Sequence, residues 1–216
     1  NANPDAPEIV RCFLSLNPNV DICDEWGMTA LMHASANCYP HAPEIVQNLV
    51  EYSSQKSWGC ERIGKRDENG WNSVMQAVSN VEGRPSPCII RYLVEYVRKH
   101  SDESHVRAVI DTPDIFGWTA LMRTVNGIVP QSLETARYLV ACGANVNARN
   151  DSGGTVLTVA LGNNVFRHLR DADGESVQRK MVRMLLDTGR LDVNAIDGEG
   201  WSMLDCAKYT DDATII

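Results

Sequence analysis

The segment Asp114–Thr124, with the sequence DIFGWTALMRT, decides the fold because its pattern returns four more times along the chain. The related segments are DEWGMTALMHA from Asp24, DENGWNSVMQA from Asp67, NDSGGTVLTVA from Asn150 and DGEGWSMLDCA from Asp197. Their turn glycines are 43, 47, 36 and 47 residues apart, at Gly27, Gly70, Gly117, Gly153 and Gly200. A repeat with this spacing is typical of a solenoid, in which small units stack on one another. Such a protein offers an extended binding surface rather than a catalytic pocket.

The first half of the third copy predicts a turn followed by a short helix. Asp114 suits the start of a turn, and Gly117 can adopt the positive φ that such a turn needs. The hydroxyl of Thr119 is placed to cap a helix. The following residues recur at helical spacing and predict one buried face, made of Ala120, Leu121, Thr124 and Val125.

The second half of the copy predicts another helix and an extended finger. We expect Asn126–Gly127 to end the first helix in the left-handed conformation, and Pro130 prevents that helix from continuing. A second helix over residues 133–142 should end before Gly143. Its predicted inner face consists of Leu133, Ala136, Leu139 and Val140. The stretch NVNARND then leads as a finger to the next turn.

These units resemble the ankyrin repeat. The matching segments are GWTALM with ETARYLVACGANVNA, LDVNAIDGEGWSML, and two second-helix segments, APEIVRCFL from Ala6 and APEIVQNLV from Ala42. The resemblance covers nearly the whole chain and implies an all-α ankyrin-repeat solenoid of about five units plus partial terminal repeats. We expect a single array over residues 1–216, with units starting near residues 24, 67, 114, 150 and 197. Residues 1–23 then form the second helix and finger of a preceding repeat. Because both ends look cut, we favour a segment of a longer protein.

The chain departs from the family in length and in one motif. Its units exceed the family period of about 33 residues, and the extra residues fall in segments 53–65, 98–110 and 163–178. We expect the second segment to lengthen its helix and the third to form a projecting loop. The histidine of the family's T-P-L-H motif is replaced, so we expect packing to substitute for its hydrogen bonds. The replacing residues are Met32, Met75, Met122, Thr158 and Asp205.

Composition narrows the class of partner and the compartment. The net charge of -8 argues against binding to nucleic acid or to anionic membranes. No apolar run approaches the ~20 residues that a membrane span needs, so we expect no membrane insertion. The seven cysteines are scattered singly, which predicts buried, reduced thiols in a reducing compartment. We expect a cytoplasmic protein, with the nucleus or a host cytosol as alternatives.

No group of residues predicts chemistry. The five histidines are dispersed without the spacing of metal ligands, and no nucleotide-binding or nucleophile motif is present. Asp171, Asp173 and Glu175 alternate in one segment, but Val182 stands where an EF-hand needs its bidentate glutamate. We expect a solvated charged loop there. The array is therefore predicted to have no catalytic, cofactor-binding or metal-binding residues and not to be an enzyme.

The turns carry the candidate partner-binding residues. Numbered from the turn Asp or Asn, the third and fifth residues include four of the five tryptophans of the chain, and tryptophan is a favoured anchor at interfaces. Resemblance to ankyrin proteins implies that these positions, with the exposed side of the first helix, contact partners. A tryptophan after the turn glycine can instead pack on the neighbouring finger, and both readings stay open. The candidates are Trp26, Met28, Trp71, Phe116, Trp118, Arg123 and Trp201.

The leading hypothesis is a monomeric scaffold that binds a protein or peptide in a concave groove formed by fingers and first helices. Trp71, Phe116 and Trp118 are expected at its centre. The residues nine positions after each turn start vary in chemistry, as expected of a surface that recognises one partner; they are His33, Gln76, Arg123, Val159 and Cys206. An alternative is a targeting or regulatory arm of a larger multidomain protein, such as a microbial effector, whose catalytic domain lies outside this chain.

Two finger asparagines are candidates for modification. The resemblance implies that Asn194 is a possible substrate of an intracellular asparaginyl hydroxylase, because Leu186 and Asp192 precede it by eight and two residues. Asn147 is a weaker candidate, since it lacks the acidic residue. The alternative is that both asparagines only brace their fingers.

Overall fold

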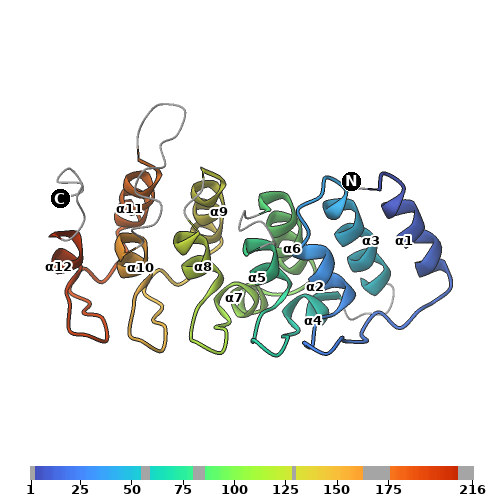
Figure 1. The fold of residues 1–216 in the computed structure, drawn as a ribbon, viewed down its shortest axis with the longest axis horizontal. Coiled ribbons are helices and arrows are strands. Elements are labelled where there is room, and N and C mark those ends of the chain that lie inside the picture. Colours follow the sequence, from blue (N-terminus) through green and yellow to red (C-terminus); the bar gives the residue numbers. More distant parts are fainter. Residues whose placement is uncertain (1–2, 55–58, 80–85, 128–129, 163–175, 209–216) are drawn as a thin grey trace. The chain divides into compact units, whose positions relative to one another are not determined.

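A computed structural model describes residues 3–54, 59–79, 86–127, 130–162 and 176–208 (Figure 1). These residues form α-helices joined by turns and extended fingers, and the only strand-like pairings among them are two isolated bridges, Arg149–Thr155 and Ile196–Ser202. The predicted all-α class is thus confirmed. The residues group into two compact units, Asn1–Thr112 and Pro113–Ile216.

The first unit contains helices in pairs, as the sequence predicted. The first helix of a repeat packs on the second, α2 on α3 and α5 on α6. Second helices stack on one another, α1 on α3 and α3 on α6, and first helices do the same, α2 on α5. The helices are α1 (Ala6–Ser15), α2 (Ala30–Ser35), α3 (Ala42–Ser54), α4 (Gly59–Gly64), α5 (Ser73–Val78), α6 (Pro87–His100) and α7 (Glu103–Asp111).

The second unit repeats this arrangement. Here α8 packs on α9 and α10 on α11, while α8 stacks on α10, α9 on α11 and α10 on α12. Its core includes the fully buried Leu121, Met122, Leu139 and Met181. The helices are α8 (Ala120–Asn126), α9 (Pro130–Ala141), α10 (Val156–Gly162), α11 (Val177–Asp187) and α12 (Met203–Lys208).

The first helices are short, and their caps define where they begin. Helices of six or seven residues are not stable alone in water, so packing must hold them. The Thr119 hydroxyl accepts a hydrogen bond from the Met122 amide at 3.3 Å, as predicted, and Thr29 does the same for Met32. In α5, Asn72 takes this role for the Met75 amide at 3.0 Å.

The turn glycine brings successive turns close together. Gly117 has φ of 77°, and the turn glycines at 27, 70, 153 and 200 are also left-handed, as expected. A Cβ atom at Gly117 would lie 2.7 Å from the backbone nitrogen of Asp151 in the next turn. The Asp151 amide donates to the Phe116 carbonyl at 3.1 Å, so the glycine permits one turn to bond to the next.

Two of the three extra segments contain additional helices. The expectation that residues 98–110 simply lengthen a helix is wrong, because α6 ends at His100 and Ser101 is extended. The Asp102 carboxylate then caps a separate helix, α7, by accepting from the His105 amide at 3.1 Å. Within segment 53–65, α4 packs on α6 and α7 and buries Ile63. The predicted projecting loop lies largely outside the described residues.

Three smaller expectations need correction. Gly127 has φ of -85°, so α8 ends without a left-handed residue, by a bond from the Gly127 amide to the Arg123 carbonyl. Ala136 and Leu139 are buried, but Leu133 and Val140 are only half-buried. All seven cysteines are free, but only Cys142 is buried, so the expectation of buried thiols is wrong for the others. Cys60 and Cys206 are half-buried, and four are exposed: Cys12, Cys23, Cys38 and Cys88. Among the described residues, no helix is long and apolar enough to cross a membrane.

Candidate functional site

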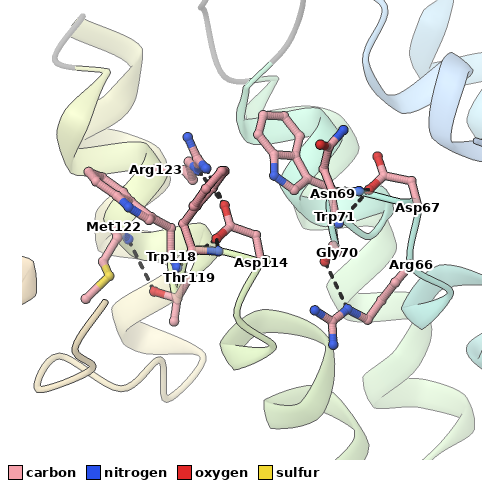
Figure 2. Close-up of polar contacts among 11 residues, drawn as sticks. Arg66, Asp67, Asn69, Gly70, Trp71, Asp114, Trp118, Thr119, Met122 and Arg123 are labelled. Carbon is pink, nitrogen blue, oxygen red and sulfur yellow. Dashed lines mark hydrogen bonds and ion pairs between the residues drawn. The ribbon is translucent and has the colours of Figure 1, made fainter. Parts of the chain in front are cut away.

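The turn carboxylates fix the backbone at the candidate binding residues. In four turns, Oδ1 of the first residue accepts from the amides of the third and the fifth residues. For Asp114 these are the amides of Phe116 at 2.8 Å and Trp118 at 2.9 Å. Figure 2 shows the same arrangement at Asp67, whose carboxylate faces Asn69 and Trp71. The aromatic side chains therefore project from a backbone of fixed conformation.

The second carboxylate oxygen binds the first helix of the same repeat. Oδ2 of Asp24 lies 2.6 Å from Nε2 of His33, and Gln76 donates to Oδ2 of Asp67 at 2.8 Å. Arg123 donates through Nε at 3.1 Å, and through a second nitrogen, to Oδ2 of Asp114. Three of the residues expected to recognise a partner therefore hold their own turn.

Burial and hydrogen bonding have opposite effects on these carboxyls. Burial alone would raise the pKa of Asp114, but the hydrogen bonds from Arg123 and from the Trp118 and Phe116 amides outweigh it and hold that pKa below its usual value. The pKa of Asp24 is also lowered, because its bonds with the Met28 amide and His33 outweigh desolvation. Both carboxyls are therefore anions at neutral pH.

Arg123 links the Asp114 turn to Trp118 (Figure 2). The guanidinium carbon of Arg123 lies 5.1 Å from the Trp118 ring centroid, which is within the range of a cation–π interaction. The Asp114 side chain is 0% exposed, and that of Arg123 is 22% exposed. The pair is thus buried on its acidic side and reaches solvent on its basic side.

Exposure separates the candidate residues into two groups. Trp26 is 55% exposed, Phe116 59% and Trp201 37%, whereas Met28, Trp71, Trp118 and Arg123 are half-buried. Ile115, next to Phe116, is also exposed, although its position did not single it out in the sequence. Trp71 belongs to the first unit and Phe116 and Trp118 to the second, so their grouping in one groove stays a prediction.

In three repeats, the side chain that stands in place of the motif histidine forms a hydrogen bond. The expectation that packing alone substitutes for it is wrong, because the replacing side chain accepts from the cap residue three positions earlier. The acceptors are Met32 Sδ from the Thr29 amide at 3.4 Å, Thr158 Oγ1 from the Thr155 amide at 2.7 Å, and Asp205 Oδ2 from the Ser202 amide at 3.1 Å. Sulfur, hydroxyl and carboxylate acceptors thus serve at one position.

The two finger asparagines differ in their surroundings. Asn147 braces neighbouring fingers, since it donates to the Arg190 carbonyl and accepts from the Asp192 amide, both at 2.8 Å. Asn194 is exposed, and its side chain forms no hydrogen bond with the residues that the structure describes.

The structure adds nothing in favour of metal chemistry. In the described part of the chain, no three His, Cys, Asp or Glu residues are grouped so that they could hold a metal ion. Asp171, Asp173 and Glu175, considered for calcium, lie outside the described residues. His33 and His105 pair with aspartates instead, His33 with Asp24 and His105 with Asp102.

Comparison with known proteins supports the same architecture. Residues 2–105 match a model of three ankyrin repeats, and residues 116–151 match a single ankyrin repeat. An ankyrin repeat domain from Acinetobacter baumannii AYE is similar, with 24% identity and a TM-score of 0.68, over 94% of this chain and 86% of that one. The ankyrin repeat domain of Bcl-3, a member of the IkappaB protein family, is 22% identical with a TM-score of 0.66, over 93% of this chain and 72% of that one. No curated protein sequence matches the chain. The family models cover more than half of the chain, which therefore belongs to the ankyrin repeat family, whose repeats are generally protein–protein interaction modules.

Proposed function

We propose that this chain binds a partner protein or peptide through its turns and first helices, with the aromatic third residues of the turns as anchors. The observation that carries the proposal is the exposure of Trp26 and Phe116 on turns whose backbone is fixed by Asp24 and Asp114. Large aromatic side chains dominate the energy of many interfaces. Here their backbone is ordered before binding, which lowers the entropic cost of forming a complex.

Charge around Trp26 suggests the chemistry of the partner. Glu25 and Glu68 are both exposed beside it, and the Glu68 amide donates to the Trp26 carbonyl at 3.0 Å. An acidic rim around an aromatic anchor favours an apolar segment flanked by lysine or arginine. Binding should therefore weaken as salt is added, mainly through slower association.

Selection of peptides from a random library on the intact chain, followed by calorimetry, tests the proposal. Trp26→Ala or Phe116→Ala should weaken binding of a selected peptide by about 2 kcal/mol or more, the scale of an interface anchor. Tyr39→Ala is a matched control, because Tyr39 is 52% exposed but lies outside the turns. Both anchors are exposed, so the melting temperature should change little.

The outcomes are distinct. If Tyr39→Ala weakens binding as much as Trp26→Ala and Phe116→Ala do, recognition is not centred on the turns. If none of the three variants changes affinity for any selected peptide, the proposed anchors are wrong.

A further inference from the structure

A pocket lies among the two helices that this chain adds to the ankyrin repeat. Helices α4 and α7 fall in the extra segments 53–65 and 98–110, and they pack on α6 and on each other. The pocket between α4, α6 and α7 has a volume of about 330 Å³ and lies within the first unit. This volume is at the lower end of the range of ligand pockets, so it suits a side chain or a small molecule. Its lining includes Gly59, Glu61, Tyr96, His100, Ser101 and His105.

Aromatic rings form one wall of the pocket. Tyr96 and His100 lie one helical turn apart on α6, and their rings stack with centroids 4.2 Å apart. A Cβ atom at Gly59 would lie 2.5 Å from the Tyr96 hydroxyl, so the glycine lets Tyr96 lie close to the start of α4. Aromatic faces attract cations, and a planar cation can also stack on them.

The polar groups of the pocket are placed to accept hydrogen bonds. Nδ1 of His100 lies 2.8 Å from the Tyr96 carbonyl oxygen, and Nδ1 of His105 lies 2.9 Å from the Asp102 carboxylate. A carbonyl or a carboxylate only accepts, so Nδ1 is the donor in both rings, and Nε2 of the neutral ring is left as an acceptor. The Glu61 side chain is exposed, and it forms no ion pair with the residues that the structure describes. A ligand with several donors therefore matches this lining.

Charge favours a cation in this pocket over an anion. The lining contains the Glu61 carboxylate but no lysine or arginine. Arg62, the next residue of α4, is paired with Asp21, which does not line the pocket. In the described part of the chain, no three His, Cys, Asp or Glu residues are grouped so that they could hold a metal ion. An organic cation therefore fits the pocket better than a metal ion does.

We propose that this pocket binds a guanidinium group, carried by an arginine side chain or by a small guanidine compound. The planar cation stacks on the Tyr96–His100 pair and donates two parallel hydrogen bonds to the Glu61 carboxylate. An ammonium group fits less well, because it is not planar and cannot form this paired contact. The site involves none of the turn residues, so the inference does not rest on the proposed binding through the turns.

Titration of the intact chain with acetyl-arginine methylamide, followed by ¹H–¹⁵N NMR, tests the proposal. Saturable shifts are expected at the amides of Gly59 and Ser101, which line the pocket. Acetyl-citrulline methylamide has the same shape without the charge and should bind at least about fivefold more weakly. Butylguanidine carries the same cation without a peptide backbone. Tighter binding of butylguanidine indicates a free guanidine compound as the ligand, and tighter binding of the arginine derivative indicates a peptide.

Two variants and a matched control assign the binding to this pocket. Glu61→Gln keeps the shape of the side chain but removes its charge, so it should raise the dissociation constant of the arginine derivative about fivefold. His100→Ala removes the ring that stacks on Tyr96 and should also weaken binding. Glu103→Gln is the control, because Glu103 is exposed on α7 but does not line the pocket. All three residues are exposed, so the variants should fold, which circular dichroism checks.

Three outcomes overturn the proposal. The first is the absence of a saturable shift at Gly59 and Ser101, and the second is equal binding of the arginine and citrulline derivatives. The third is equal affinity of the Glu61→Gln and Glu103→Gln variants for the arginine derivative. Trp26→Ala should leave this affinity unchanged, which separates the pocket from the proposed binding through the turns.

Discussion

Among the turn aspartates, we expect Asp114 to contribute most to stability. Replacing Asp114 by alanine should lower the free energy of unfolding more than the same change at any other turn aspartate. The Asp114 carboxylate accepts hydrogen bonds from two backbone amides and from the Arg123 guanidinium, and its side chain is 0% exposed. Without this carboxylate, the two amides and the guanidinium must donate to water instead. The guanidinium reaches solvent readily, because it is already 22% exposed, whereas the amides lie in a packed turn.

These contacts set the magnitude. A hydrogen bond to a charged group contributes roughly 1.5–3 kcal/mol, and loss of one partner of a buried ion pair costs up to about 5 kcal/mol. Since Arg123 can recover water, we expect Asp114→Ala to cost about 2–4 kcal/mol. Asp67→Ala should cost about 1–3 kcal/mol, because Asp67 is also buried but its partner on the first helix, Gln76, is neutral. Asp24→Ala should have the smallest effect, because its turn is exposed to solvent.

Urea-induced unfolding followed by far-UV circular dichroism measures the cost in each variant. Amide hydrogen exchange adds a local measurement, since the amides of Phe116 and Trp118 should lose protection in Asp114→Ala. Arg123→Gln is a matched control, because glutamine fills the same position opposite Asp67 and bonds to it at 2.8 Å. That variant should cost less than Asp114→Ala. If Asp114→Ala costs below about 0.5 kcal/mol, or if Asp24→Ala costs as much, the turn carboxylate does not hold the repeat as we argue.

Three further predictions concern the same turns and helices, and a fourth concerns the last finger. The lowered pKa of Asp114 means that the unfolded chain binds more protons in acid, so its contribution to stability is present above the unfolded pKa of about 4 and is lost as pH falls through the folded pKa; Asp114→Asn should flatten stability against pH in this range. Leu121→Ala removes a 0% exposed side chain and should cost about 2–5 kcal/mol by urea unfolding, and a change below about 0.5 kcal/mol would mean that the predicted register is wrong. Trp118→Ala should weaken peptide binding by about 2 kcal/mol or more if Trp118 is an anchor, and should instead lower the melting temperature with affinity unchanged if it only packs. Mass spectrometry after incubation with an asparaginyl hydroxylase should show oxidation of Asn194, which is exposed, and not of Asn147, which braces two fingers; an unmodified Asn194 peptide contradicts this.

The repeat register could be predicted from the sequence because local interactions set it. The positive φ of Gly117 and the cap formed by Thr119 each involve residues within one turn of chain. Burial of Leu121 follows from helical periodicity and needs no knowledge of its neighbours. Such features can be recognised before the fold is known.

The extra helices α4 and α7 could not be separated from longer loops or longer helices by pattern alone. The boundary between α6 and α7 depends on two residues, the extended Ser101 and the cap Asp102, in a stretch rich in good helix formers. Besides the Asp102 cap, the packing of α7 on α4, α5 and α6, which buries Val106 and Val109, stabilises a second helix there. Contacts between segments distant in sequence therefore decided what local propensity left open.

At the residues nine positions after each turn start, a structural role produced a pattern that resembles partner recognition. Their varied chemistry suggested a surface that recognises a partner, but His33, Gln76 and Arg123 are each directed to their own turn carboxylate. Several different side chains can donate a hydrogen bond from this position, so its variation carries little information about a partner.

The same reasoning predicts that the fourth turn is held by fewer side-chain contacts than the first three. In the fourth turn, the residue nine positions on is Val159, which has no donor to offer, and the turn begins with Asn150 instead of an aspartate. The Asn150 side-chain oxygen still accepts from the Gly154 amide at 2.7 Å. However, Val159 cannot donate a hydrogen bond to the Asn150 side chain. The fourth turn also carries Ser152 and Gly154 at its third and fifth positions, where each of the other turns carries at least one aromatic residue. The fourth turn thus lacks both the donor on the first helix and the aromatic residues, whereas the fifth turn keeps Trp201 although Cys206 stands at its ninth position, so the bond to the first helix is one of several contacts that hold aromatic residues in place.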